Sequence, residues 1–300
     1  MNGLRPYINY LTAIALALVV VSCDEGPQEA AVEEGAVIEE VVVIEDQVHY
    51  TIPSPHETMD FLKSSGSDFR PEFLCSTSIR EQYVDLKGKS MGMGIFIADL
   101  AYTATFSEFQ ESIKYFNAIV LMADDIGIGS SFDAALMGRI ENNLEHSDSL
   151  QAISDASYYK IIGELEANDR GHVVGMIAAG GFLESLFIAV QLVDKFDAED
   201  PLIKRIAAQK LVYENIMKYL EQYKDDQNVE WTIMDMSALN EIFSEVSDNR
   251  KDTKLEKNAS GKNVLGGTGG VYITEPEFED LRDKVTTLRN AITFNNPMPQ

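Results

Sequence analysis

Two long segments of the chain, residues 91–106 and 172–193, are apolar around almost their whole helical circumference. A helix without a polar stripe must be covered on all sides, so both segments are expected at the centre of a bundle. The second segment carries Gly or Ala at 175 and 178–181, which would let a neighbouring backbone approach closely. The sequence therefore predicts an all-α domain, a multi-helix bundle or an array of antiparallel helical hairpins, with these two helices in the middle.

Capping signals place further helices around this pair. At four predicted helix starts a polar residue stands before a Pro or Glu, and its side-chain oxygen can accept from free backbone N–H groups. These residues are Ser54, Ser107, Asp200 and Thr274. Helix ends are predicted at Gly66, Gly88 and Gly127. We predict helices at 55–65, 77–87, 90–106, 108–126, 132–145, 149–168, 171–195, 201–223, 232–247 and 276–293.

One segment near the C-terminus breaks the helical pattern. Residues 248–273 are polar and include four glycines between 266 and 270, so we expect a flexible, Gly-rich surface loop within a single helical domain, 51–300. The loop lacks a phosphate-binding motif, because Gly267 stands where that motif needs Lys.

The 172–193 segment is long enough to suggest a membrane span. Glu184 lies near its middle, where a carboxylate costs about 2.5 to 3.5 kcal/mol in a bilayer, and Lys or Arg anchors are missing before it. We therefore expect a buried core helix instead.

The N-terminus has the order of an export signal. Arg5 precedes an apolar run at 11–21 and then Val20-Val21-Ser22-Cys23. This pattern resembles the lipobox of bacterial lipoproteins, although Val20 stands where Leu is commonest and the positive region holds one Arg. The resemblance implies removal of a signal peptide, 1–22, and a lipid on Cys23, which would make the membrane a partner. The alternative is an ordinary signal peptide cleaved elsewhere.

If Cys23 carries a lipid, Cys75 has no partner in the mature chain and no disulfide is expected. We expect Cys75 to be a small buried hydrophobic residue, since nothing near it in sequence would lower its thiol pKa.

The segment after Cys23 is strongly acidic. Residues 24–46 hold nine acids and no Lys or Arg, which predicts a solvated tether, 23–50; a partner-binding acidic arm is the alternative. Without Arg5, 23 basic residues remain against 49 acidic ones. Nucleic acid is excluded as a partner on this charge, whereas a small molecule or an envelope protein is compatible with it.

Signatures of catalysis are missing. The four histidines lack metal-ligand spacing, and the chain has no nucleophile elbow, so no catalytic residue, metal or cofactor is predicted. The one lead is polar chemistry inside the central helices, where Asp99 and Glu184 should be partly desolvated. We predict a candidate ligand pocket of Asp99, Tyr102, Glu184 and Gln191. The alternative is that each is satisfied by a private structural partner.

Several stretches resemble a group of uncharacterised lipoproteins of the Bacteroidetes: residues 94–102, 115–119, 125–128 and 178–186. The resemblance implies a helical fold and an envelope address, and it implies no reaction. In that setting Asp24-Glu25 resembles a surface-export signal, which favours a lipid-anchored protein of the outer membrane; in enterobacteria Asp24 would favour inner-membrane retention.

Three functional hypotheses follow. The first is a non-enzymatic lipoprotein whose helical domain binds a ligand or partner. The second is an enzyme that uses Asp99 and Glu184 as acid and base. The third is a structural subunit of an envelope complex, which predicts a large exposed apolar patch.

Overall fold

A computed structural model describes residues 54–129, 132, 136, 138–139, 143, 147–248, 254–257, 263–266 and 270–294. These residues belong to one compact unit. The predicted signal peptide and tether lie outside them, and so does nearly all of the helix predicted at 132–145.

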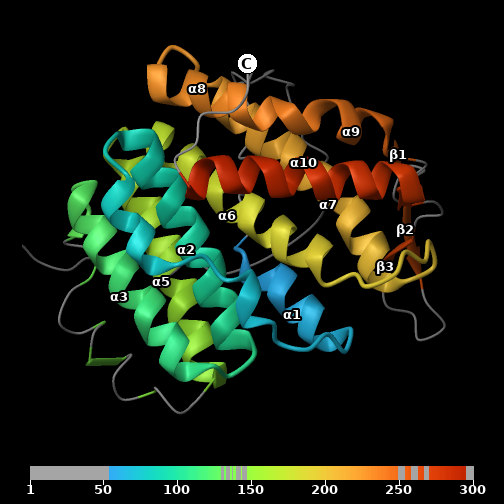
Figure 1. Cartoon of the computed structure of the whole chain (residues 1–300), viewed down its shortest axis with the longest axis horizontal. Coiled ribbons are helices and arrows are strands. Elements are labelled where there is room, and N and C mark those ends of the chain that lie inside the picture. Colours follow the sequence, from blue (N-terminus) through green and yellow to red (C-terminus); the bar gives the residue numbers. More distant parts are fainter. Residues whose placement is uncertain are drawn as a thin grey trace, which may run out of the picture. The chain divides into compact units, whose positions relative to one another are not determined.

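The all-α prediction is confirmed: long helices dominate the fold (Figure 1). They are α1 (His56–Ser64), α2 (Leu86–Thr105), α3 (Phe109–Asp125), α5 (Ser147–Ala167), α6 (Gly171–Gln191), α7 (Pro201–Glu221), α8 (Gln227–Met236), α9 (Asn240–Glu245) and α10 (Glu275–Thr293). Short 3-10 helices are η1 (Pro71–Phe73), η2 (Thr77–Gln82) and η4 (Ser237–Leu239).

The two apolar segments form α2 and α6, which pack against each other in the middle of the domain. Glycines permit this contact. A Cβ on Gly94 of α2 would lie 2.0 Å from the carbonyl oxygen of Ile177, and a Cβ on Gly180 of α6 would lie 2.0 Å from that of Met91. The predicted close backbone approach is confirmed, because no side chain fits between the two helices there.

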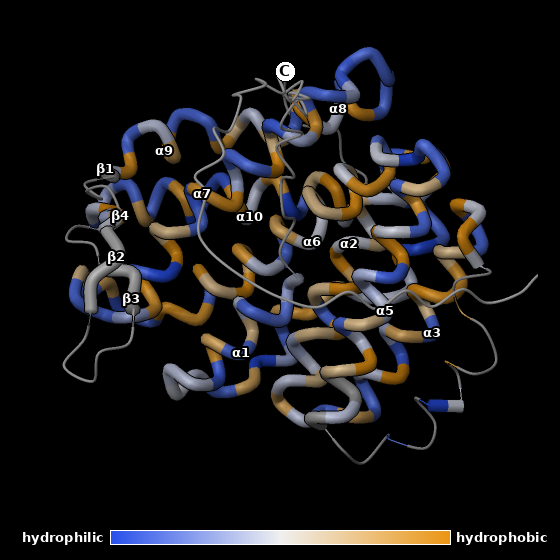
Figure 2. Tube along the Cα trace, turned by 180° about the vertical axis from the view of Figure 1, so that it is seen from behind, coloured by the Kyte–Doolittle hydropathy of each residue, from blue (hydrophilic) through white to orange (hydrophobic). Residues whose placement is uncertain are grey.

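The other helices cover this pair. α3 packs on α2, α7 packs on α6, and α10 runs alongside α6 although it is the last of the described helices (Figure 1). Hydrophilic and hydrophobic turns alternate along these outer helices (Figure 2), as expected for helices with one covered face. α6 has the length and hydropathy of a membrane span, but its apolar stretch is wholly buried by its neighbours, as in the core helix of a globular domain.

Most predicted helix ends are found close to their positions. Thr274 and Glu277 form a reciprocal capping box, Asp200 accepts from the N–H of Leu202 at 2.7 Å, and Gly66 and Gly127 have positive φ. Other predictions were wrong. The helix predicted at 77–87 is η2 followed by extended residues, and Gly88 lies in the first turn of α2. In place of the single helix predicted at 232–247, the chain forms α8, η4 and α9, and α8 begins at Gln227 because Asp226 caps it.

Gly88 lies inside α2 because this helix begins at a cap that the sequence analysis did not predict. Asp85 accepts from the N–H of Gly88 at 2.6 Å, and α2 begins at Leu86, four residues before the predicted start at 90. Similarly, Ser107 does not cap α3: it has φ 66°, and its N–H donates to Ala104, so it ends α2 instead.

The segment expected as a flexible loop contains strands. β1 (Ser247–Asp248) pairs antiparallel with β4 (Val271–Tyr272), and β2 (Lys254–Lys257) pairs antiparallel with β3 (Asn263–Gly266). Val246, Val271 and Ile273 are buried and fix both ends of the segment on the domain. The buried ends bring the chain back on itself, which allows backbone pairing that the polar sequence did not suggest.

The glycine contact predicts opposite effects for two Gly→Ala variants. Gly180→Ala should lower the free energy of unfolding by at least about 1 to 3 kcal/mol, because the new methyl meets backbone rather than a flexible side chain. Gly163→Ala, on α5 with nothing within 4 Å, should raise it by about 0.4 to 1 kcal/mol. Urea denaturation monitored by circular dichroism measures both; equal effects would contradict the assigned packing.

Candidate functional site

The structure brings together two of the four predicted pocket residues. Asp99 of α2 and Glu184 of α6 are both 0% exposed and face each other across the α2–α6 contact, and no donor from another residue reaches Asp99 Oδ1. The prediction that these carboxyls are desolvated and need partners is therefore correct. Their partner is the side chain of Arg289.

Arg289 of α10 neutralises the pair. Its Nε donates to Glu184 Oε2 at 2.9 Å and its Nη2 donates to Glu184 Oε1 at 2.8 Å, a bidentate ion pair. Nη2 also donates to the carbonyl oxygen of Phe73 at 3.2 Å, and the guanidinium lies over the Phe187 ring at 4.5 Å. One buried cation thus serves two buried acids and ties α10 to α6.

The two carboxyls share one negative charge. Burial raises the pKa of Asp99 well above its usual value, and the charge and hydrogen bond of Glu184 raise it further. Burial also raises the pKa of Glu184, but Arg289 and the hydrogen bond from Asp99 oppose that rise. Asp99 therefore keeps a proton and donates it to Glu184, whose charge faces Arg289.

The backbone at Cys75 completes this cluster. The N–H of Cys75 donates to Asp99 Oδ2 at 3.1 Å, and the hydroxyl of Tyr115 donates to the Cys75 carbonyl oxygen at 2.6 Å. Burial and the nearby acids raise the pKa of the Cys75 thiol, which is 3% exposed. Cys75 is the small buried hydrophobic residue that the sequence predicted.

The other two predicted pocket residues lie apart from the acids and make bonds of their own. The hydroxyl of Tyr102 accepts from the N–H of Arg70 at 2.8 Å, and its ring packs on Phe106; burial raises its pKa to about 12. The side chain of Gln191 donates to the Thr286 hydroxyl at 2.8 Å. Each has a structural partner, as the alternative interpretation expected.

A cavity lies on the other side of α6, between α1, α2, α6 and α7. We call it the polar chamber, and it has a volume of about 40 Å³. The Ser54 hydroxyl on its wall donates to Asp155 at 2.6 Å. Its polar lining residues are Ser54, Glu57, Thr58, Tyr158, Ser185, Arg205 and Gln209. Ser185 is 5% exposed and its Oγ has no hydrogen-bond partner, and the buried Nε of Arg205 has none either. Unpaired buried donors are costly, which makes this cavity the strongest candidate site among the residues described.

A second cavity of about 40 Å³ lies between α2, α3 and α5, and we call it the apolar chamber. Its lining includes Leu100, Ala104, Ile113, Phe116, Ile119, Ile153 and Ile161. The hydroxyls of Ser112 and Ser157 on its wall donate to backbone carbonyls of their own helices. Ile97 and Tyr158 line both chambers, so the two cavities adjoin.

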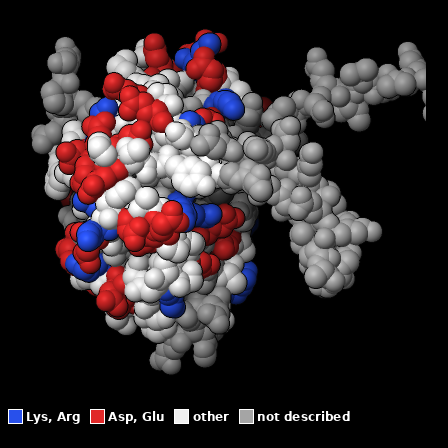
Figure 3. Space-filling model, turned by 90° about the vertical axis from the view of Figure 1, so that its right-hand side faces the viewer, with Lys and Arg blue, Asp and Glu red and all other residues white. Residues whose placement is uncertain are grey.

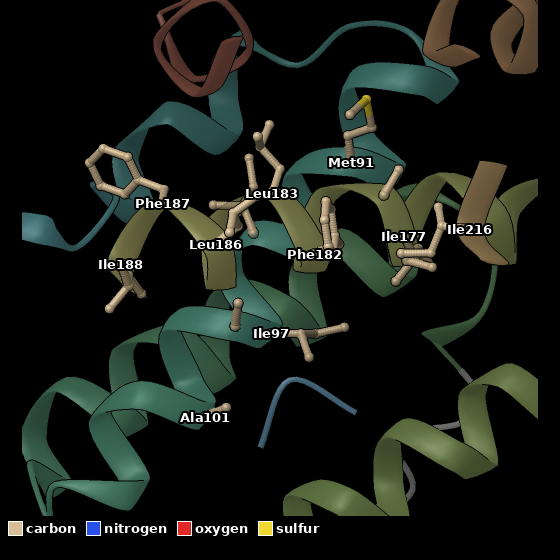
Figure 4. Close-up of a cluster of buried hydrophobic side chains, with 14 of the residues drawn as sticks. Met91, Ile97, Ala101, Ile177, Phe182, Leu183, Leu186, Phe187, Ile188 and Ile216 are labelled. Atoms are coloured by element: carbon tan, nitrogen blue, oxygen red, sulfur yellow. The ribbon is translucent and has the colours of Figure 1, made fainter. Parts of the chain in front are cut away.

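Part of the lining of the polar chamber is hydrophobic. Figure 4 shows Ile97 on α2, Ile177 and Phe182 on α6, and Ile216 on α7, and all four line that chamber. Sequence analysis missed Ser185, Arg205 and Gln209 because they lie on two helices and carry no motif. An unpaired serine inside an otherwise apolar helix was the signal available.

Chemistry that needs a metal has no support in the part of the chain that the structure describes, where no three His, Cys, Asp or Glu side chains group together. Comparison of the chain with protein-family models, curated proteins and solved structures gave no match. The site must therefore be interpreted from its own geometry.

Removal of the buried cation should be strongly destabilising. Arg289→Met leaves the charge of Glu184 buried without a countercharge, so we expect the free energy of unfolding to fall by about 3 to 5 kcal/mol. Lys284→Met, on the same helix and paired only with the exposed acids Glu241 and Asp280, should cost less than about 1 kcal/mol. Chemical denaturation of both variants tests this. A small effect of Arg289→Met would show that the ion pair contributes little to the stability of the fold.

Asp99 should also make stability depend on pH. Because its pKa is raised in the folded state, folded Asp99 holds a proton that the unfolded chain loses above about pH 4. The contribution of Asp99 to the free energy of unfolding therefore decreases as pH rises toward the folded pKa, by at most about 1.4 kcal/mol per pH unit. Asp99→Asn keeps both hydrogen bonds and removes the titration. Its stability relative to wild type should increase from pH 5 to pH 8 in urea titrations; parallel curves would mean that Asp99 is ionised.

Proposed function

We propose that this chain is a membrane-anchored lipoprotein of the bacterial envelope whose helical domain binds a small ligand without catalysing a reaction. The anchor rests on the sequence before Cys23 and the acidic tether after it. The binding role rests on the polar chamber, where Ser185 and Arg205 present donors without partners. A ligand that accepts from them would remove the cost of leaving them unpaired.

The buried acids support binding over catalysis. Asp99 and Glu184 have no exposed surface, and Glu184 and Arg289 already satisfy each other. A general acid or base must reach the atom it protonates or deprotonates. We therefore assign the cluster a structural role: it fixes α2, α6 and α10 around the chambers.

A purely structural role would favour a broad exposed apolar surface. Among the described residues, the large exposed hydrophobic side chains are Val84, Leu121, Tyr159, Trp231, Met234, Tyr272 and Phe294, spread over several elements. Acidic and basic side chains are scattered over the face in Figure 3. This surface favours a ligand inside the domain over a wide docking face.

The anchor is tested by Cys23→Ala in cells fed radiolabelled palmitate. Wild type should take up label and fractionate with membranes, whereas the variant should take up none, because the thiol that would receive the lipid is gone. Cys75→Ala is the matched control and should label like wild type. Equal labelling of Cys23→Ala and wild type would exclude lipid attachment at this position.

The binding role is tested by native mass spectrometry of the protein purified from its own membranes. We expect a bound small molecule that is lost from Gln209→Leu, which removes a polar group of the chamber, and kept by Gln222→Leu on the exposed end of the same helix. A molecule that stays bound to both variants would place the site elsewhere.

A further inference from the structure

The two adjoining chambers suggest what kind of molecule the domain takes. One is lined by hydrophobic side chains, and the next one holds unpaired polar groups, with Ile97 and Tyr158 between them. A ligand that fills both must have an apolar body and a polar head. We propose that the site binds a short-chain aliphatic monocarboxylate, with its tail in the apolar chamber and its carboxylate in the polar one; this inference rests on the proposed binding function.

The head group follows from the donors. Ser185 offers a hydroxyl, Arg205 offers an unpaired Nε–H and a positive charge, and the amide of Gln209 is held only by a 3.4 Å bond to the Arg205 carbonyl oxygen. Three donors and a cation select an acceptor that carries negative charge, and a carboxylate can accept all three bonds.

Two acids lie beside the polar chamber. Glu57 lines it, but its side chain is 65% exposed and 4.0 Å from the Arg205 guanidinium, and such a long, solvated ion pair is weak. Asp155 accepts from the Ser54 hydroxyl at 2.6 Å, and its side chain is 36% exposed. The Arg205 guanidinium also lies 5.7 Å from the Phe61 ring, but its Nε–H has no acceptor and is available to a carboxylate.

The tail follows from the other chamber. Two of its serines, Ser112 and Ser157, donate to backbone carbonyls, and most of the remaining lining is aliphatic or aromatic. Each chamber holds about three water-sized groups at its volume of about 40 Å³. A carboxylate in one chamber and a three-carbon tail in the other fill this space, which is the size of butyrate and excludes a long fatty acid.

The experiment is equilibrium dialysis of the full chain in nanodiscs against radiolabelled butyrate, with empty nanodiscs as the blank. We expect saturable binding to one site that unlabelled butyrate displaces and butylamine does not. Binding without saturation, or equal displacement by butylamine, would overturn the carboxylate assignment. Displacement by palmitate at lower concentration than butyrate would overturn the assigned tail length.

Variants of each chamber locate the ligand. Ser185→Ala should weaken butyrate binding at least tenfold, because it removes a hydrogen bond to a charged group. Ala104→Leu should do the same by filling the apolar chamber. The controls are Gln222→Leu, exposed at the C-cap of α7, and Ala156→Leu, exposed on α5, and both should stay within twofold of wild type. Affinities that do not separate the two sets would overturn the assignment to these chambers.

Ser185→Ala should have different effects on stability and on affinity. In the free protein the Ser185 hydroxyl lacks a partner, so Ser185→Ala should leave the thermal unfolding midpoint unchanged or raise it while it lowers affinity. If Ala104→Leu fails to fold, Arg205→Gln serves instead: it should lose butyrate and retain neutral butanol. A copurifying ligand without a carboxylate would preserve the proposed binding function and refute this inference.

Discussion

The contact between α2 and α6 is the constraint on which the rest of the structure depends. Gly94 and Gly180 bring the two backbones so close that no Cβ fits between them. This proximity joins the carboxyl groups of Asp99 and Glu184, and it explains why both helices are covered on every side. The outer helices then pack around a rigid pair.

Two buried acids at such a contact need a cation, and α10 supplies it. Arg289 reaches Glu184 from a helix more than a hundred residues away, and the same guanidinium binds the carbonyl oxygen of Phe73. An ion pair of this kind adds little net stability compared with apolar packing, yet loss of one partner is costly. The ion pair instead fixes where α10 docks, because Arg289 meets Glu184 at only one position of this helix.

The chambers lie on the other side of this rigid centre. Ser185 follows Glu184 directly, so a single turn of α6 directs one polar side chain to the ion pair and the next to the polar chamber. The first is satisfied within the fold and the second is not. This contrast separates the structural polar groups of the core from those available to a ligand.

The sequence by itself determined the helical class, the central position of α2 and α6, most caps and the burial of Asp99, Glu184 and Cys75, because periodicity and capping are local properties. Only the tertiary structure decided which partners those acids have. Arg289 looks like any Arg of an amphipathic helix, and Tyr102 and Gln191 were placed with the acids although Arg70 and Thr286 hold them elsewhere. Only the tertiary structure decided the chambers as well. A cavity forms where several helices leave space between them, and no single segment of the sequence encodes that space.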